Sequence, residues 1–337
     1  MYEMEEKRKM KRIKRLIAMF MVAFTIVALV PAVSGNKKVE AAASAYQTSA
    51  TTTSVTFKWV KYTGSRTVTA YYIGYADAEL DNSSSIAMDM ARSKKISVSA
   101  TTTAYTLKNL KAGKKYDVVV FYGYNDSYGA QTGYHYSCYC KTLYNKVTGF
   151  NLSDYYLPAS ETGKASFKVE WLEKKYADGY QFVVYSNGGT QIASKFCSYN
   201  YATFDEAKYN ASYRVRVRSY IDCNGTKKYS AWSSYYYIVM QPKITSAVIN
   251  SKGALAIKWD KVTGADSYEV YISTEGGRLG FKKVATVTGT AKTVATFNSK
   301  KFSKTGTYYV VVRAVKKVGS TLKYYSGSDY VLKVSPY

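Results

Sequence analysis

Apolar and polar residues alternate with period two along most of the chain after residue 50. This alternation is typical of β-strands that bury one face, and no amphipathic stripe of three or more helical turns interrupts it. Three segments show the alternation most clearly, residues 53–60, 164–171 and 253–260, and they place Trp59, Trp171 and Trp259 on the inward face. The pattern predicts an all-β protein.

The same pattern repeats along the chain, which indicates internal duplication. A tryptophan precedes a strand tyrosine in each copy, and the pairs are Trp171–Tyr180, Trp259–Tyr268 and, with a longer turn, Trp59–Tyr72. A later strand in each copy starts at an equivalent tyrosine: Tyr116, Tyr213 and Tyr308. We predict three units, residues 44–143, 144–241 and 242–337, each large enough to bury a modest core without a metal or a disulfide.

About seven short strands per unit, with turns between them, are typical of a β-sandwich. On the repeated tryptophans and tyrosines, the units resemble fibronectin type III repeats of the kind found on exported proteins of Gram-positive bacteria. The resemblance covers nearly all of residues 44–337. It implies an immunoglobulin-like sandwich in which the repeated tryptophans fill the cores and Tyr116, Tyr213 and Tyr308 form tyrosine corners. The first unit departs most, through Ala76–Ser93, which we expect to form a loop or an irregular edge.

Residues 1–43 are predicted to be a signal peptide and are excluded from the fold. A basic region precedes 21 uncharged residues, Leu16–Asn36, and Ala41–Ala43 supplies the small residues that a signal peptidase accepts. An uncleaved membrane anchor is the alternative, because the uncharged stretch is just long enough to cross a bilayer. In both cases we expect the remainder to be exported, as a secreted or extracellular cell-surface protein.

The chain is strongly basic, with a formal net charge of +25. Without residues 1–43 it keeps 39 basic and 19 acidic residues, a net charge of +20. An exported protein with this excess is expected to adsorb to cell-wall or host polyanions and glycans. The alternative is a solvated surface that only maintains solubility, and no feature indicates a specific nucleic-acid partner.

Four cysteines are few for a disulfide-based scaffold in an oxidising compartment. Cys138 and Cys140 are two apart on one strand, which is poor geometry for a bridge, whereas Cys197 and Cys223 are candidates for a disulfide if their strands are close. The single histidine, His135, precedes the first pair as H-x2-C-x-C. Strand alternation predicts that its ring points away from both sulfurs, so we predict no metal site.

No set of residues indicates catalysis or a cofactor. Carboxylates are sparse and do not recur at equivalent positions, whereas glycoside hydrolysis needs an opposed pair. The glycine-rich stretch Gly276–Gly280 has no strand and helix around it and is interpreted as a turn, not as a phosphate-binding loop. We predict that the chain is not an enzyme.

Two features favour a binding function. Arg214, Arg216 and Arg218 alternate with inward valines, so they should project from one sheet as a cationic row suited to phosphate, sulfate or carboxylate groups. The alternative is that cross-strand glutamate or tyrosine side chains cover them. The 37 tyrosines include clusters that must be partly exposed, which suits binding surfaces, although tyrosine also favours strands in general.

Residues Tyr229–Ser233, "YSAWS", resemble the Trp-Ser-x-Trp-Ser element of cytokine-receptor sandwiches, with one tryptophan instead of two. We interpret this segment as a bracing motif and not as a contact site. Together, these features predict a non-catalytic secreted or cell-surface protein that binds anionic or carbohydrate polymers or acts as a spacer. The alternative is a substrate-binding accessory subunit of a secreted polysaccharide hydrolase.

Overall fold

A computed structural model describes residues 45–156, 165–275, 279–289, 294–297, 302, 306–319, 322–325 and 331–334. The predicted signal peptide lies outside these residues. Among the residues described, no helix has both the length and the apolar character needed to cross a membrane.

The described strands form three β-sandwiches, each made of two antiparallel sheets, so the predicted fold class is confirmed. In the first sandwich, the sheets are β1(Tyr46–Ala50)-β2(Val55–Lys58)-β5(Ala104–Leu107) and β4(Ser97–Ser99)-β3(Ala70–Asp77)-β6(Lys115–Asp126)-β7(Gly129–Lys141). In the second sandwich, one sheet is β12(Tyr201–Ala207)-β9(Ala165–Glu170)-β8(Asn151–Tyr156). The other sheet is β11(Gln191–Cys197)-β10(Gly179–Ser186)-β13(Ser212–Cys223)-β14(Thr226–Tyr229), and β15(Tyr236–Val239) also pairs with β13. In the third, they are β16(Ile244–Ile249)-β17(Leu255–Trp259)-β20(Val294–Phe297) and β19(Lys282–Thr288)-β18(Ser267–Ser273)-β21(Tyr308–Val318)-β22(Leu322–Tyr325), and β23(Leu332–Val334) also pairs with β21.

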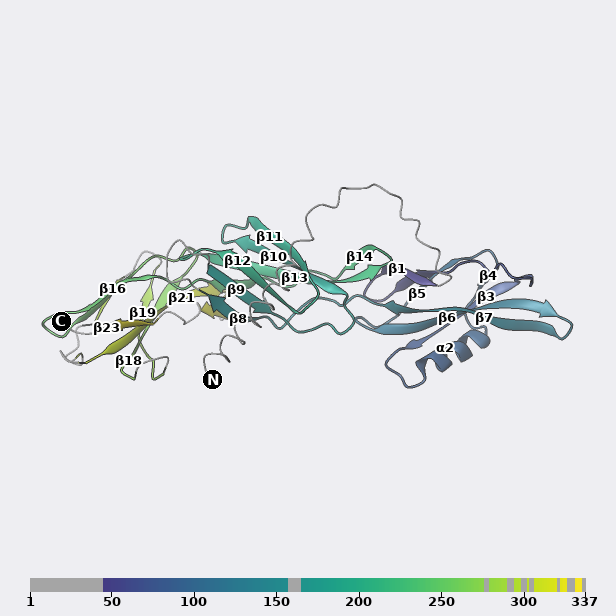
Figure 1. The fold of residues 1–337 in the computed structure, drawn as a ribbon, viewed down its shortest axis with the longest axis horizontal. Helices are drawn as coiled ribbons and strands as arrows, with labels where there is room; N and C mark the ends of the chain where they lie inside the picture. The colour runs from purple at the N-terminus through teal and green to yellow at the C-terminus, as the bar shows by residue number, and fades with distance from the viewer. Residues whose placement is uncertain are drawn as a thin grey trace, which may run out of the picture. The chain divides into compact units, whose positions relative to one another are not determined.

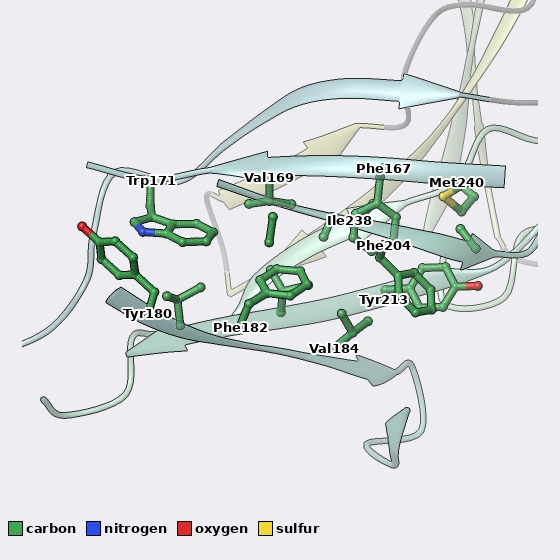
Figure 2. Packing of buried hydrophobic residues seen from close by; sticks show 14 of the residues in the cluster. Phe167, Val169, Trp171, Tyr180, Phe182, Val184, Phe204, Tyr213, Ile238 and Met240 are labelled. Atoms are coloured by element: carbon green, nitrogen blue, oxygen red, sulfur yellow. The ribbon is translucent and has the colours of Figure 1, made fainter. Parts of the chain in front are cut away.

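Each sandwich has its own hydrophobic core, which the repeated aromatic residues help to fill. All of these side chains are buried: Trp59, Trp171, Trp259, Tyr116, Tyr213 and Tyr308. Figure 2 shows the second core, with Trp171 beside Tyr180 at one end and Phe204 beside Tyr213 at the other. The hydroxyl groups of Tyr116 and Tyr213 accept backbone N–H groups five residues upstream, at 2.9 and 2.8 Å, as in tyrosine corners.

The tyrosine that packs against each tryptophan also braces the preceding turn. The hydroxyls of Tyr180 and Tyr268 accept the backbone N–H groups of Lys174 and Val262, each at 2.8 Å. In the first sandwich Tyr71 has this role, not the predicted Tyr72: its ring centroid is 5.6 Å from that of Trp59, and its hydroxyl accepts the N–H of Tyr62. The longer turn shifts the equivalent position by one residue, and a shift of one residue reverses the face of the sheet.

The insertion in the first unit is a helix, α2 (Ser83–Arg92), and not the loop or irregular edge that the sequence predicts. The helix lies against the outer face of the β3–β6 sheet (Figure 1), where Ala87 and Ala91 are buried. Gly74 permits this approach, because a Cβ there would collide with the carbonyl oxygen of Ala87. The hydroxyls of Ser83 and Ser84 donate to the carboxylate of the buried Asp117. Ten residues give fewer than three turns, which is too short for periodicity alone to reveal the helix.

Candidate functional site: an arginine–aromatic ladder on the second sandwich

Strand β13 presents three arginines on the outer face of its sheet. Val215 and Val217 are buried in the core, and the residues that alternate with them, Arg214, Arg216 and Arg218, are half-buried on the other side. Their register partners on β10 are Tyr185, Val183 and Gln181. The guanidinium groups therefore lie in one row, at a spacing of about 6.6 Å along the strand.

Aromatic rings separate the guanidinium groups along this row. The Cζ atom of Arg218 lies 3.7 Å from the ring centroid of Tyr229 and 4.4 Å from that of Trp232. The Cζ atom of Arg216 lies 4.5 Å from the ring of Trp232, and that of Arg214 lies 4.9 Å from the ring of Tyr235. Arg216 is also 5.5 Å from the ring of Tyr235. We call this alternating row the ladder, and it consists of Tyr229, Arg218, Trp232, Arg216, Tyr235 and Arg214.

The segment that supplies Trp232 is held along β13 by hydrogen bonds, although it is not a regular strand. The backbone N–H of Ser233 donates to the carbonyl oxygen of Val217 at 2.9 Å, and the N–H of Val217 donates to the Ser233 hydroxyl at 3.0 Å. Ser230 makes the same pair of bonds with Ser219, at 2.9 and 3.0 Å. Two serines three residues apart thus fix the backbone on either side of Trp232. The backbone that carries Trp232 is therefore held in place without a ligand.

The ladder arginines make few polar contacts with the protein. The Nε of Arg218 donates to the side-chain oxygen of Gln181 at 2.8 Å, and the Nε of Arg216 donates to the Tyr185 hydroxyl at 3.0 Å. The Nε of Arg214 is buried and has no hydrogen-bond partner in the described part of the chain. Within that same part, no carboxylate forms an ion pair with any of the three guanidinium groups. Burial lowers the pKa of Arg218, and repulsion from Arg216 adds to this effect, whereas Tyr229 opposes it.

The position equivalent to Arg218 is covered in the first sandwich and lies opposite a carboxylate residue in the third. Counting from the corner tyrosines, Arg218 corresponds to Phe121 in the first sandwich and to Arg313 in the third. Phe121 is buried and packs in the cluster beneath α2. Arg313 has the carboxylate residue Glu269 as its register partner, where Arg218 has the neutral Gln181. The second sandwich therefore differs from its neighbours in presenting this row without an opposing carboxylate.

Cys197 and Cys223, the predicted disulfide candidates, are both free thiols. Cys197 on β11 pairs with Tyr180, which in turn pairs with Ser219 on β13, four residues before Cys223. Two strand spacings and four residues put the cysteines well beyond the roughly 7 Å limit for bridging Cα atoms. Burial raises the pKa of each thiol to about 11.

His135 lies on the core side of β7, contrary to the expectation from alternation. A β-bulge makes it the extra residue, because Val120 pairs with Tyr136 and Phe121 pairs with Tyr134. Its ring packs 5.6 Å from that of the buried Tyr71. Burial lowers the pKa of His135, and a 2.7 Å hydrogen bond from Nε2 to the Val60 carbonyl partly opposes this. No group of three or more metal-ligating side chains occurs in the residues that the structure describes.

Comparison with known proteins identifies the type of domain. Residues 44–135 match the Fibronectin type III domain family. The first sandwich is therefore of the fibronectin type III kind, and the second and third have the same strand order. Domains of this kind are commonly non-catalytic binding or spacer modules.

Two solved structures with such domains are similar to the chain. The chicken CNTN1 FN1–FN3 domains have 12% sequence identity over 87% of this chain and 98% of that chain, with a TM-score of 0.25. A two-domain fibronectin type III segment from chicken tenascin has 14% identity over 58% of this chain and 96% of that chain, with a TM-score of 0.28. No curated protein has a sequence that matches this chain.

Proposed function

We propose that this chain is an exported, non-catalytic binding protein whose ladder holds sulfate, phosphate or carboxylate groups of an anionic polymer at the cell surface. One observation carries the proposal: three guanidinium groups alternate with aromatic rings along one row, and no carboxylate among the described residues is paired to them. The formal charge of +20 on residues 44–337 adds a long-range attraction for the same ligands.

The aromatic contacts prepare the arginines for this role. Each guanidinium group lies beside at least one aromatic ring, and within the described residues only the Nε donors of Arg216 and Arg218 are used in hydrogen bonds. The planar fork of N–H groups matches the oxygens of sulfate, phosphate and carboxylate, and each such bond is charge-assisted. Because the side chains are already held in place, binding loses less conformational entropy than it would with free arginines.

The test is the salt concentration at which the exported chain elutes from immobilised dextran sulfate or polyphosphate. We expect Arg214→Gln/Arg216→Gln/Arg218→Gln to elute at clearly lower salt than the parent. The matched control, Lys95→Gln/Lys108→Gln/Lys111→Gln, removes the same charge from exposed positions of the first sandwich.

The control should elute close to the parent if the ladder is the binding site. Equal shifts for the two variants would mean that net charge alone causes retention. A parent that stays bound at 1 M salt, where the Debye length is about 3 Å, would contradict the electrostatic mechanism.

A further inference from the structure

Two exposed tyrosines lie on the other sheet of the second sandwich, away from the ladder. Tyr199 precedes β12 and is 67% exposed, and Tyr201 begins β12 and is 40% exposed. Their rings are parallel to within 8°, with centroids 5.6 Å apart. Single exposed aromatic residues are common, but a parallel exposed pair forms an apolar surface of defined orientation.

The backbone between the two tyrosines is fixed to the core. The carbonyl oxygen of Asn200 accepts the backbone N–H of Trp171 at 3.0 Å. The side-chain amide of Asn200 donates back to the carbonyl oxygen of Trp171 at 2.8 Å. Trp171 is itself buried in the core, so the pair has a rigid support. A rigid aromatic surface loses little entropy on binding.

The charges beside the pair do not add up to a positive surface. The Nζ atom of Lys168 lies 4.2 Å from the ring centroid of Tyr201 and forms a 2.9 Å ion pair with Glu170. Asp154 is the register partner of Lys168 on β8 and adds a second negative charge. The hydrogen bond from Lys168 lowers the pKa of Glu170, so this carboxylate is ionised at neutral pH. This surface has no electrostatic attraction for a polyanion, because the local charge is not positive.

We infer that Tyr199 and Tyr201 form a binding site for an uncharged polysaccharide. A pyranose ring has an apolar C–H face, which packs on an aromatic ring, and hydroxyl groups around its edge, which need hydrogen-bond partners. The Tyr199 ring, the more exposed of the stacked pair, supplies the first surface, because Lys168 lies over the Tyr201 ring. Lys168 and Glu170 supply donors and an acceptor beside it. The second sandwich would then carry a charged-polymer site and a neutral-polymer site on its two different sheets. The inference uses none of the ladder residues, so either site can fail without the other.

Equilibrium binding of the exported chain to soluble neutral polysaccharides tests the inference. The probes are hydroxyethyl cellulose, laminarin, xylan and mannan, at 0.5 M NaCl to screen the ladder. We expect at least one probe to bind the parent, and Tyr199→Ala/Tyr201→Ala to weaken that binding by about tenfold or more. Tyr199→Phe/Tyr201→Phe should bind like the parent, because the stacking faces remain.

Two controls separate this site from general effects. Tyr128→Ala removes a tyrosine that is 90% exposed elsewhere in the chain, and the triple Arg→Gln ladder variant removes the other site. Neither should change neutral-polysaccharide binding. If the double alanine variant melts early, Tyr199→Ala alone takes its place, since that side chain is mostly exposed. The inference is overturned if no probe binds the parent, if the alanine variant binds like the parent, or if Tyr128→Ala weakens binding equally.

Discussion

Gln181→Glu would convert the ladder to the charge pattern of the third sandwich. The side-chain oxygen of Gln181 already accepts the Nε of Arg218 at 2.8 Å. Glutamate has nearly the same shape, so its carboxylate would take the same position with a negative charge. Glu269 holds the equivalent register position opposite Arg313 in the third sandwich, where its carboxylate forms an ion pair with Lys283. We expect the variant to fold normally and to bind anionic polymers more weakly.

The magnitude follows from the release of counterions. With the value for duplex DNA as a guide, each neutralised polymer charge contributes about 0.9 to the slope of log K against log salt, or about fivefold in affinity at 0.15 M salt. If the new carboxylate neutralises Arg218, one fewer polymer charge is neutralised on binding. The slope should then fall by about one and the affinity by about fivefold. The new charge-assisted hydrogen bond is half-exposed, so we expect it to stabilise the fold by only about 0.5–1 kcal/mol.

The assay is a titration of dextran sulfate into the parent and the variant between 0.05 and about 0.3 M salt, a range in which the slope is measurable. Gln131→Glu, on β7 of the first sandwich, adds the same charge away from the ladder. It should leave the slope unchanged. If Gln181→Glu and Gln131→Glu bind equally, the pairing of Arg218 does not control affinity and the reasoning is wrong.

Three further predictions concern stability and the thiols. Trp259→Ala should lower the free energy of unfolding of the third sandwich by about 3–5 kcal/mol, measured in a thermal melt. Trp259→Phe should lower it less, because the indole N–H has no hydrogen-bond partner in the described residues. Gly74→Ala should destabilise the first sandwich by about 1–3 kcal/mol in the same assay, by displacing α2; an unchanged melt would contradict this packing. Cys197 and Cys223 should react slowly with a disulfide reagent at pH 8, because pKa values of about 11 leave only about a thousandth of each thiol ionised, and the rate should rise with pH. Mass spectrometry after unfolding and alkylation should find both thiols free.

The features that could be predicted from the sequence depend on local periodicity. Alternation places Trp59, Trp171 and Trp259 on the buried face, and the structure has all three in the cores. Alternation also places Arg214 and Arg216 on the outer face of β13, where they lie. A period-two pattern is sufficient here, because each strand has one face in a core.

The features that alternation does not predict depend on breaks in periodicity or on distant partners. The bulge at His135 reverses the expected side of one ring, and the alternation itself contains no sign of the extra residue. Helix α2 packs on Gly74, a contact that its own short sequence does not reveal. The ladder needs Trp232, which comes from a segment outside the regular strands. The two serines of "YSAWS" are visible in the sequence, but the sequence does not show that they bond to β13.

The most direct test of the central proposal is an NMR titration of the arginine side chains with a fully sulfated hexasaccharide. Assigned Nε–Hε signals of Arg214, Arg216 and Arg218 report on the ladder, and Arg313, opposite Glu269, is an internal control. We predict that the ladder signals shift together and saturate while the Arg313 signal stays in place. Shifts that spread over basic residues of all three sandwiches, or that leave the ladder signals unchanged, would contradict the account.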